Sequence, residues 1–192
     1  MPVMVSRRSL LWGGMAAMSG LFVEGMARAA VVRAVTLEDL VVQSQHAFVG
    51  TPIDSFSLWE VVGRRRRLVT YTRVRAEYSF DGRPPDDPDL MVRSLGGMVD
   101  GVGQVVPGEA VLRRGSTAAL FVHRIHPTIF CVTAMAQGHY PLSADRGGVH
   151  RLNASPTALE AAPPQSAVQR LDQRTIHEAE GMVLEELKRA GH

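Results

Sequence analysis

Cysteine is nearly absent from this chain, which has a single thiol, Cys131, in 192 residues. One cysteine cannot form an internal disulfide, so no covalent crosslink within the chain stabilises the fold. Cys131 lies in the apolar run Ile129 to Val132, a setting that favours a small buried residue over a reactive nucleophile. The chain must therefore be held together by its hydrophobic core.

The motifs of several well-known chemistries are also missing. The sequence has no G-x-S-x-G nucleophile elbow, no H-E-x-x-H zinc motif and no Gly-Lys-Ser/Thr phosphate loop. His123 and His126 form an H-x-x-H pair, but in a strand positions i and i+3 point to opposite faces, so their rings would not converge on a metal. We therefore predict no catalytic residue, no cofactor and no metal site, although carboxylates brought together by the fold would escape this reasoning.

The chain has no long uninterrupted apolar run, and the apolar segment near its start resembles part of an export signal. Residues 1–29 contain Arg7-Arg8, an apolar segment from Leu10 to Val23 broken by glycines, and an A-x-A cleavage site at Ala27 to Ala29. This pattern predicts a twin-arginine (Tat) signal peptide. The alternatives are an ordinary Sec signal and an uncleaved anchor, although the segment is poorly suited to spanning a bilayer. We expect a periplasmic or extracellular protein with no transmembrane segment in its mature chain.

Removal of this signal would change the charge of the protein. Arg7, Arg8, Arg28 and Glu24 would leave, which lowers Lys+Arg from 21 to 18 and Asp+Glu from 19 to 18. The mature chain would then be neutral, and the basic character of the precursor would belong largely to the signal. A neutral chain gives no support to nucleic-acid binding.

The mature chain shows strand patterns and turn signals without alternating strands and helices. The clearest strand is expected over Leu68 to Phe80, where residues alternate with period two and one face is more polar. Further strands are expected over 47–53, 57–62, 90–95, 117–123, 128–136 and 140–142, with glycines between 96 and 108 at bulges or corners. The last two long runs, 117–123 and 128–136, are apolar at nearly every position and should be central.

Four consecutive arginines, Arg64 to Arg67, follow Gly63 at an expected hairpin turn. We favour a solvated loop tip, because long basic side chains at a turn keep strand edges soluble. An anion-binding site is the alternative. The acidic loop Pro84 to Asp89 likewise favours a stiff solvated loop over a calcium site.

Two helices are expected to flank the strands. Thr36 can cap a short helix that runs to about Gln45, and Thr175 with Glu178 has the spacing of a capping box. Residues 154–174, rich in Pro and Ala, are expected to be a linker to the C-terminal amphipathic helix, 175–192. The expected fold is therefore mainly β: a small antiparallel OB-like β-barrel over 30–153, with a short N-terminal helix and a C-terminal helix.

The order of several short motifs resembles a group of exported bacterial and archaeal proteins that is frequent in myxobacteria. The resemblance covers roughly residues 36–152. Its motifs are the segments Leu40 to Gly50, Leu68 to Phe80, Gly96-Gly97, Gly101 to Gln104 (with Gly103), Pro107-Gly108-Glu109, Ala119 to Phe121, and Ala136-Gln137-Gly138. The resemblance implies an OB-like barrel, as in netrin and tissue-inhibitor modules, sometimes found beside secreted metalloprotease domains. It implies no catalytic residues.

Three functions are compatible with this sequence. The favoured one is an exported, non-catalytic binding module of unknown ligand, with a secreted protein as a possible partner. The second is an inhibitor or accessory subunit of a secreted hydrolase, although the chain lacks the N-terminal cysteine of tissue inhibitors. The third is a hydrolase whose site assembles only in three dimensions, for which Asp100, Glu109, His123 and His139 are the first candidates.

Overall fold

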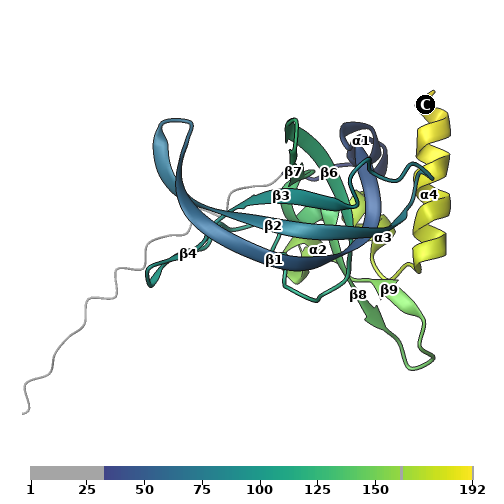
Figure 1. Cartoon of the computed structure of the whole chain (residues 1–192). Coiled ribbons are helices and arrows are strands. Elements are labelled where there is room, and N and C mark those ends of the chain that lie inside the picture. Colours follow the sequence, from purple (N-terminus) through teal and green to yellow (C-terminus); the bar gives the residue numbers. More distant parts are fainter. Residues whose placement is uncertain (1–32, 161, 192) are drawn as a thin grey trace, which may run out of the picture.

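The computed structural model describes residues 33–160 and 162–191. The predicted signal peptide, with Arg7, Arg8, Ala27 and Ala29, lies outside these ranges. The helices and strands are shown in Figure 1. In chain order they are α1 (Leu37–Gln43), β1 (His46–Val62), β2 (Arg65–Ser79), β3 (Asp89–Leu95), β4 (Gly97–Val99), β5 (Val102–Gln104), β6 (Ala118–His126), β7 (Ile129–Val132), the 3₁₀ helix η1 (Met135–Gly138), β8 (His139–Ala144), β9 (His150–Leu152), α2 (Pro156–Glu160), α3 (Ala167–Leu171) and α4 (Ile176–Arg189).

The main sheet has seven strands in the order β1-β2-β3-β7-β6-β8-β9, and β1 also pairs with β6. Backbone hydrogen bonds therefore form a ring through β1, β2, β3, β7 and β6. We expected an antiparallel sheet, but the pair of β3 with β7 is parallel, so the sheet is mixed. β4 and β5 form a separate hairpin. The fold is thus mainly β, as predicted, with a nearly closed sheet.

The long strand β1 closes the ring because it pairs with both β2 and β6. We expected two strands, 47–53 and 57–62, but β1 is continuous, with register shifts at Val49/Gly50 and between Pro52 and Asp54. Residues 46–50 pair with β6, while the strand pairs with β2 over nearly its whole length. Bulges bend a strand and increase its twist. Here they adjoin residues 48–50, which pair with β2 along one edge and with β6 along the other.

Two hydrophobic clusters lie on opposite sides of the central strands. In β6, Leu120 and Val122 point into the ring, while Ala119 and Phe121 point outward to the helices. Both faces are covered, which explains why the run is apolar at nearly every position. The prediction that β6 is central is confirmed, since it pairs with β1, β7 and β8.

Two strand boundaries differ from the sequence prediction. β2 begins at Arg65, so three of the four arginines of the expected turn belong to the strand. β7 ends at Val132, where we expected a strand to 136. Ala134 and Met135 have φ angles of 54° and 59°, and the chain turns there into η1. A pattern of apolar residues does not reveal such a left-handed turn, because neither residue is a glycine.

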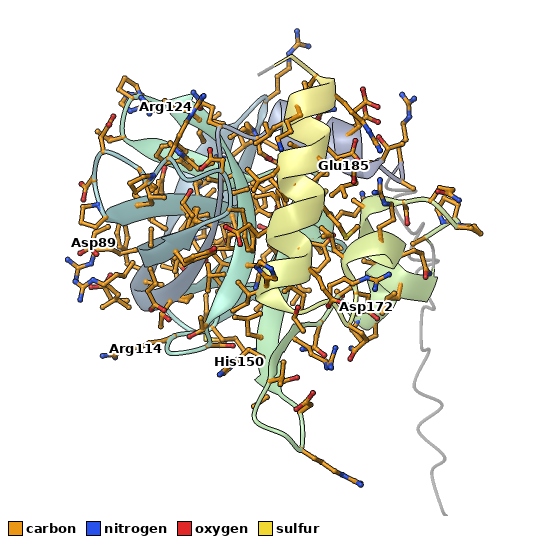
Figure 2. The ribbon with its side chains drawn as sticks, turned by 90° about the vertical axis from the view of Figure 1, so that its right-hand side faces the viewer. Asp89, Arg114, Arg124, His150, Asp172 and Glu185 are labelled. Carbon is orange, nitrogen blue, oxygen red and sulfur yellow. The ribbon has the colours of Figure 1, made fainter. Side chains whose placement is uncertain are left out.

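The helices cover the outer cluster. Thr36 caps α1, and Thr175 with Glu178 forms the predicted capping box of α4. The segment 154–174, for which we expected a linker, contains α2 and α3, and the side chains of Ala167, Val168 and Leu171 in α3 are fully buried. In Figure 2 α4 lies in front of the sheet.

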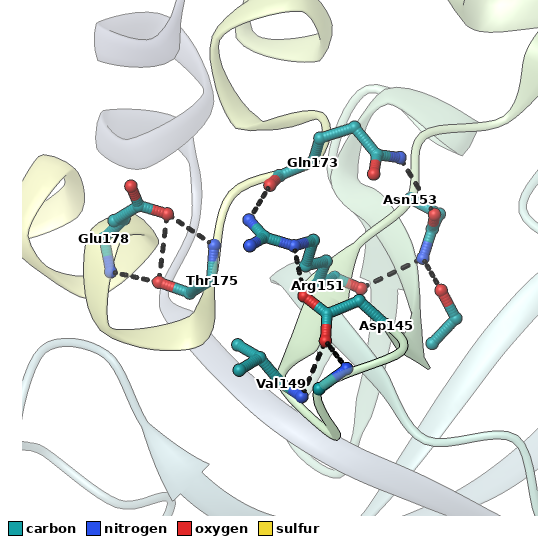
Figure 3. A network of polar contacts seen from close by, with 9 residues as sticks. Asp145, Val149, Arg151, Asn153, Gln173, Thr175 and Glu178 are labelled. Carbon is teal, nitrogen blue, oxygen red and sulfur yellow. Dashed lines mark hydrogen bonds and ion pairs between the residues drawn. The ribbon is translucent and has the colours of Figure 1, made fainter.

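The start of α4 is fastened to the β8–β9 hairpin by a polar network (Figure 3). The Arg151 guanidinium donates to Asp145 at 3.0 Å and to the backbone carbonyl of Gln173 at 3.1 Å. The amide of Gln173 donates in turn to Asn153 at 3.0 Å. The backbone of Arg151 also bridges to that of Thr175, the α4 cap. The C-terminal helix is therefore anchored at its first turn.

Gly50 is expected to be indispensable to the bend of β1. A Cβ at this position would lie 2.6 Å from the Arg75 carbonyl oxygen and 2.8 Å from the Phe48 ring. We predict that Gly50→Ala lowers the free energy of unfolding by about 1–3 kcal/mol, the usual cost of overpacking a core. Urea unfolding followed by circular dichroism would measure the change.

Gly181 provides the matched control, since a Cβ there would have no atom within 4 Å. Gly181→Ala should raise the free energy of unfolding by about 0.5–1 kcal/mol, because alanine has the higher helix propensity. Equal effects of the two substitutions would contradict the close approach of β1 and β2 at Gly50.

Candidate functional site

Five side chains form a row across the outer face of the ring, one from each strand. The register pairs Phe56 of β1 with Tyr71 of β2, Tyr71 with Arg93 of β3, Arg93 with Cys131 of β7, and Cys131 with His123 of β6. Residues directly opposite each other in a sheet place their side chains on the same face. We call these five residues the cross-strand row.

The aromatic end of the row is both exposed and ordered by stacking. The rings of Phe56 and Tyr71 are stacked, with centroids 5.4 Å apart and an interplanar angle of 15°. Phe56 is 53% exposed. Rigid aromatic rings with an open face are typical of binding surfaces, because they offer a large contact area at a small entropic cost.

Glu60 organises the middle of the row. One of its carboxylate oxygens accepts the Tyr71 hydroxyl at 2.6 Å, and the other accepts two donors of the Arg93 guanidinium, at 2.6 and 3.0 Å. Hydrogen bonds to charged groups are stronger than neutral ones. Tyr71 and Arg93 are therefore fixed relative to each other by a shared carboxylate.

These contacts set the protonation of the three groups. The hydrogen bond from Tyr71, followed by that from Arg93, holds the pKa of Glu60 below its ordinary value. Burial, followed by the hydrogen bond to Glu60, raises the pKa of Tyr71. Burial opposes the charge of Arg93, but Glu60 outweighs it, and the pKa of Arg93 is raised. The middle of the row is thus a neutralised ion pair beside a protonated phenol.

Cys131 and His123 form the other end of the row. We expected Cys131 to be buried, but it is only half-buried and lies on the outer face. Burial raises the pKa of its thiol, and Arg93 opposes this only in part, so the thiol is uncharged at neutral pH. His123 Nδ1 lies 3.3 Å from the Thr133 hydroxyl. An uncharged thiol suits contact with a ligand better than nucleophilic attack.

A shallow hollow of about 640 Å³ adjoins this end of the row, beneath the β6–β7 turn. Its lining mixes polar and apolar surface and combines the end of α1 and the α1–β1 connection with the end of β6 and the β6–β7 turn. The lining residues are Gln43, Gln45, His123, Arg124, Ile125, His126 and Pro127. The row therefore continues from an aromatic platform to an open depression.

The four residues proposed for a hidden hydrolase site are not joined by any hydrogen bond or ion pair that the described residues make. Asp100 is exposed in the β4–β5 turn, and His139 is buried at the start of β8, where burial lowers its pKa to about 4. Glu109 is half-buried, and burial raises its pKa. Of the four, only His123 belongs to the row. Among residues 33–160 and 162–191, no group of three or more His, Cys, Asp or Glu side chains is arranged to hold a metal ion.

Gly96, Gly97 and Gln104, three of the residues on which the expected resemblance rests, dock the β4–β5 hairpin onto the β1–β2 pair. Gly96 and Gly97 have φ angles of 97° and 135°, and a Cβ at Gly97 would lie 2.3 Å from the Thr70 hydroxyl. The Gln104 side chain accepts the Leu68 amide at 2.9 Å, while Gly103 lies within β5. These motif residues have structural roles.

The remaining motif residues attach loops to the core. Gly108, between Pro107 and Glu109, offers its carbonyl to the Ala136 amide at 2.9 Å. The Gln137 side chain binds the backbone of Arg33 and Val35, which fixes the segment before α1. A Cβ at Gly138 would lie 2.3 Å from the Thr133 carbonyl oxygen. Phe121 is fully buried in the outer cluster.

Comparison with known proteins gives no match: no family model, no curated protein and no solved structure is similar to this chain. Within the described ranges, no helix is both long and apolar enough to cross a bilayer. The geometry of the cross-strand row is therefore the basis for inferring its function.

Sequence reasoning missed most of this row. The alternation of 68–80 placed Tyr71 on the more polar face of its strand, which was a usable signal. Glu60, Arg93 and Phe56 lie in other segments, and only the register brings them to Tyr71. Strand register between distant segments cannot be read from periodicity.

We predict that Glu60 and Arg93 are energetically coupled. A double-mutant cycle with Glu60→Gln and Arg93→Gln should give a coupling of about 1–2 kcal/mol in the free energy of unfolding, because the pair is partly buried and joined by two charge-assisted bonds. The control cycle uses Asp54→Asn and Arg73→Gln, a pair with both side chains about half exposed, and should give less than about 0.5 kcal/mol. Similar values for both cycles would contradict the described organisation of the row.

Proposed function

We propose that this chain is an exported, non-catalytic binding module whose ligand lies on the cross-strand row. The proposal adopts an OB-like β-barrel for the five-stranded ring. The ring of β1, β2, β3, β7 and β6 supports this interpretation, since OB folds are five-stranded, partly open barrels. Ligands of such barrels bind across the face of the second and third strands and the loops beside it. Here that face carries Tyr71 and Arg93.

The observation that supports binding most strongly is the exposed aromatic stack beside ordered hydrogen-bonding groups. Phe56 and Tyr71 supply flat apolar surface, while Arg93, although paired with Glu60, supplies donors beside it. A ligand of matching chemistry has a planar or apolar face for the rings and acceptor groups at its edge. Oligosaccharides and extended peptides with an aromatic or carboxylate side chain both satisfy this description.

The same groups are poorly suited to catalysis. The Cys131 thiol is held uncharged by burial, and its neighbour Arg93 is committed to Glu60. A nucleophile needs an adjacent base that takes its proton, and His123 contacts Thr133 instead. Export by the twin-arginine route, to the periplasm or beyond it, remains the proposal that rests on Arg7-Arg8 and Ala27 to Ala29.

Cys131 allows the proposed site to be tested without a known ligand, because it is the only thiol of the chain. The purified full chain is mixed with fractions of the producing cell's culture medium and periplasm, and alkylation of Cys131 by iodoacetamide is followed by mass spectrometry. We expect at least one fraction to slow alkylation severalfold, because a ligand on the row covers the thiol.

Two variants separate specific protection from a general effect. Phe56→Ala removes half of the aromatic stack and should abolish the protection, whereas Tyr78→Phe, elsewhere on β2, should retain it. Unfolding measurements should show that both variants are folded. If no fraction protects Cys131, or if Phe56→Ala is protected as well as the unsubstituted chain, the row is not the binding site.

A further inference from the structure

The outer end of the β1–β2 pair projects beyond the rest of the sheet (Figure 1). β3 pairs with β2 only from Val69 onward, and β6 pairs with β1 only up to Gly50. Beyond these points β1 and β2 continue as a two-stranded ribbon to the pair Val62 with Arg65. We call residues 61–67 the ribbon tip.

The ribbon tip concentrates positive charge without a compensating acid. Arg64, Arg65 and Arg66 are exposed, and Arg67 is intermediate. None of the four takes part in the ion pairs that the described residues form. The nearest acid in the sequence, Glu60, is occupied by Arg93 and Tyr71. Four unneutralised guanidinium groups on adjacent residues create a local positive potential.

Apolar side chains accompany these arginines. Val61 lies within the tip and is 76% exposed, and Trp59, two residues before it, is 37% exposed. The Arg66 guanidinium lies over the Trp59 ring, 5.0 Å from its centroid. Trp and Arg are the side chains that settle at a membrane interface, because each combines an apolar body with a polar or charged end.

The β4–β5 hairpin lies on the same side of the molecule as the ribbon (Figure 1). Its bonds to Leu68 and Thr70 hold it against the base of the ribbon. Met98 and Val102 on this hairpin are more than half exposed, and Val105, just after it, is 90% exposed. The basic tip carries exposed apolar side chains of its own, and a hairpin with further exposed apolar side chains is bonded to its base. This combination matches a bilayer, whose surface can be negatively charged and whose interior is apolar.

We propose that the ribbon tip docks onto an anionic lipid bilayer. The arginines contact lipid phosphates, while Val61 and Trp59 enter the boundary between headgroups and acyl chains. A nucleic acid is the poorer match, since the mature chain is neutral overall and the tip offers valines where polar base-reading side chains would be needed. The site is separate from the cross-strand row, so either proposal can fail alone.

Trp59 provides a local reporter of this docking. The chain has two tryptophans, and Trp12→Phe leaves Trp59 as the only one. In this background, vesicles of phosphatidylcholine with one quarter phosphatidylglycerol should shift Trp59 emission to shorter wavelength and protect it from acrylamide. Pure phosphatidylcholine vesicles should do neither. Residues 1–32 are the same in every variant, so binding that they contribute does not distinguish the variants.

The charge requirement is tested with two matched pairs of arginines. Arg64→Gln with Arg65→Gln should lower the partition coefficient about 25-fold, since each arginine near an anionic surface contributes roughly fivefold. Arg113→Gln with Arg114→Gln removes the same charge from another exposed pair and should change it less than about twofold, because the effect falls off within a Debye length. That second pair lies in a loop bonded to Pro52, which is roughly 30 Å along β1 from the ribbon tip.

The contribution of apolar side chains to bilayer binding is tested with a second matched pair of variants. Val61→Ser should weaken binding severalfold, whereas Val149→Ser, on the β8–β9 hairpin, should not. The proposal is overturned if Trp59 emission is the same with both vesicle types, or if the two arginine pairs have equal effects. It is also overturned if the chain binds heparin or an oligonucleotide through the tip but leaves anionic vesicles unbound.

Discussion

The close approach of β1 and β2 at Gly50 is the constraint on which the rest of the structure depends. Because a side chain at this position would collide with the Arg75 carbonyl oxygen, only glycine lets the strand bend there without displacing its partner. Residues 46–50 of β1 pair with β6, while the strand from Phe48 to Val62 pairs with β2 along its other edge. β1 is therefore the strand that closes the ring, since it pairs with both β2 and β6.

Closure of the ring determines both cores and the candidate site. The inward faces of the strands enclose one hydrophobic cluster, and the outward faces of β1, β6 and β8 receive the helices. No residue of β2, β3 or β7 belongs to the outer cluster, although Tyr78 near the end of β2 donates to Glu180 of α4. Tyr71, Arg93 and Cys131 align on the outward faces of these three strands, since the register of three successive strand pairs places them opposite one another. The row is therefore a consequence of register rather than of any local motif.

Because the row depends on register between distant strands, only features set by neighbouring residues could be predicted from the sequence. Local signals worked well: the caps at Thr36 and Thr175 and the central position of β6 all follow from residues close together in the chain. The mixed character of the sheet and the helices within 154–174 depend on contacts between distant segments, and they were missed.

The candidate site depends on such distant contacts even more strongly. The carboxylate of Glu60 and the guanidinium of Arg93 are separated by 33 positions in the chain, yet they form the strongest contact of the row. The histidine pair at 123 and 126, which attracted attention in the sequence, contributes one residue to the row and no metal site among the described residues. Gly96 and Gly97, which were expected at bulges or corners, let the β4–β5 hairpin dock.

The most direct test of the proposed binding site replaces Phe56 with photoreactive benzoyl-phenylalanine and irradiates the producing cells. Mass spectrometry then identifies what is attached to position 56, whether a small molecule or a protein. The same replacement of Tyr78, exposed elsewhere on β2, serves as the control. If the ligand binds on the cross-strand row, a single class of adduct forms at position 56 and is absent at position 78. No adduct at position 56, or the same adducts at both positions, would contradict the proposed binding site.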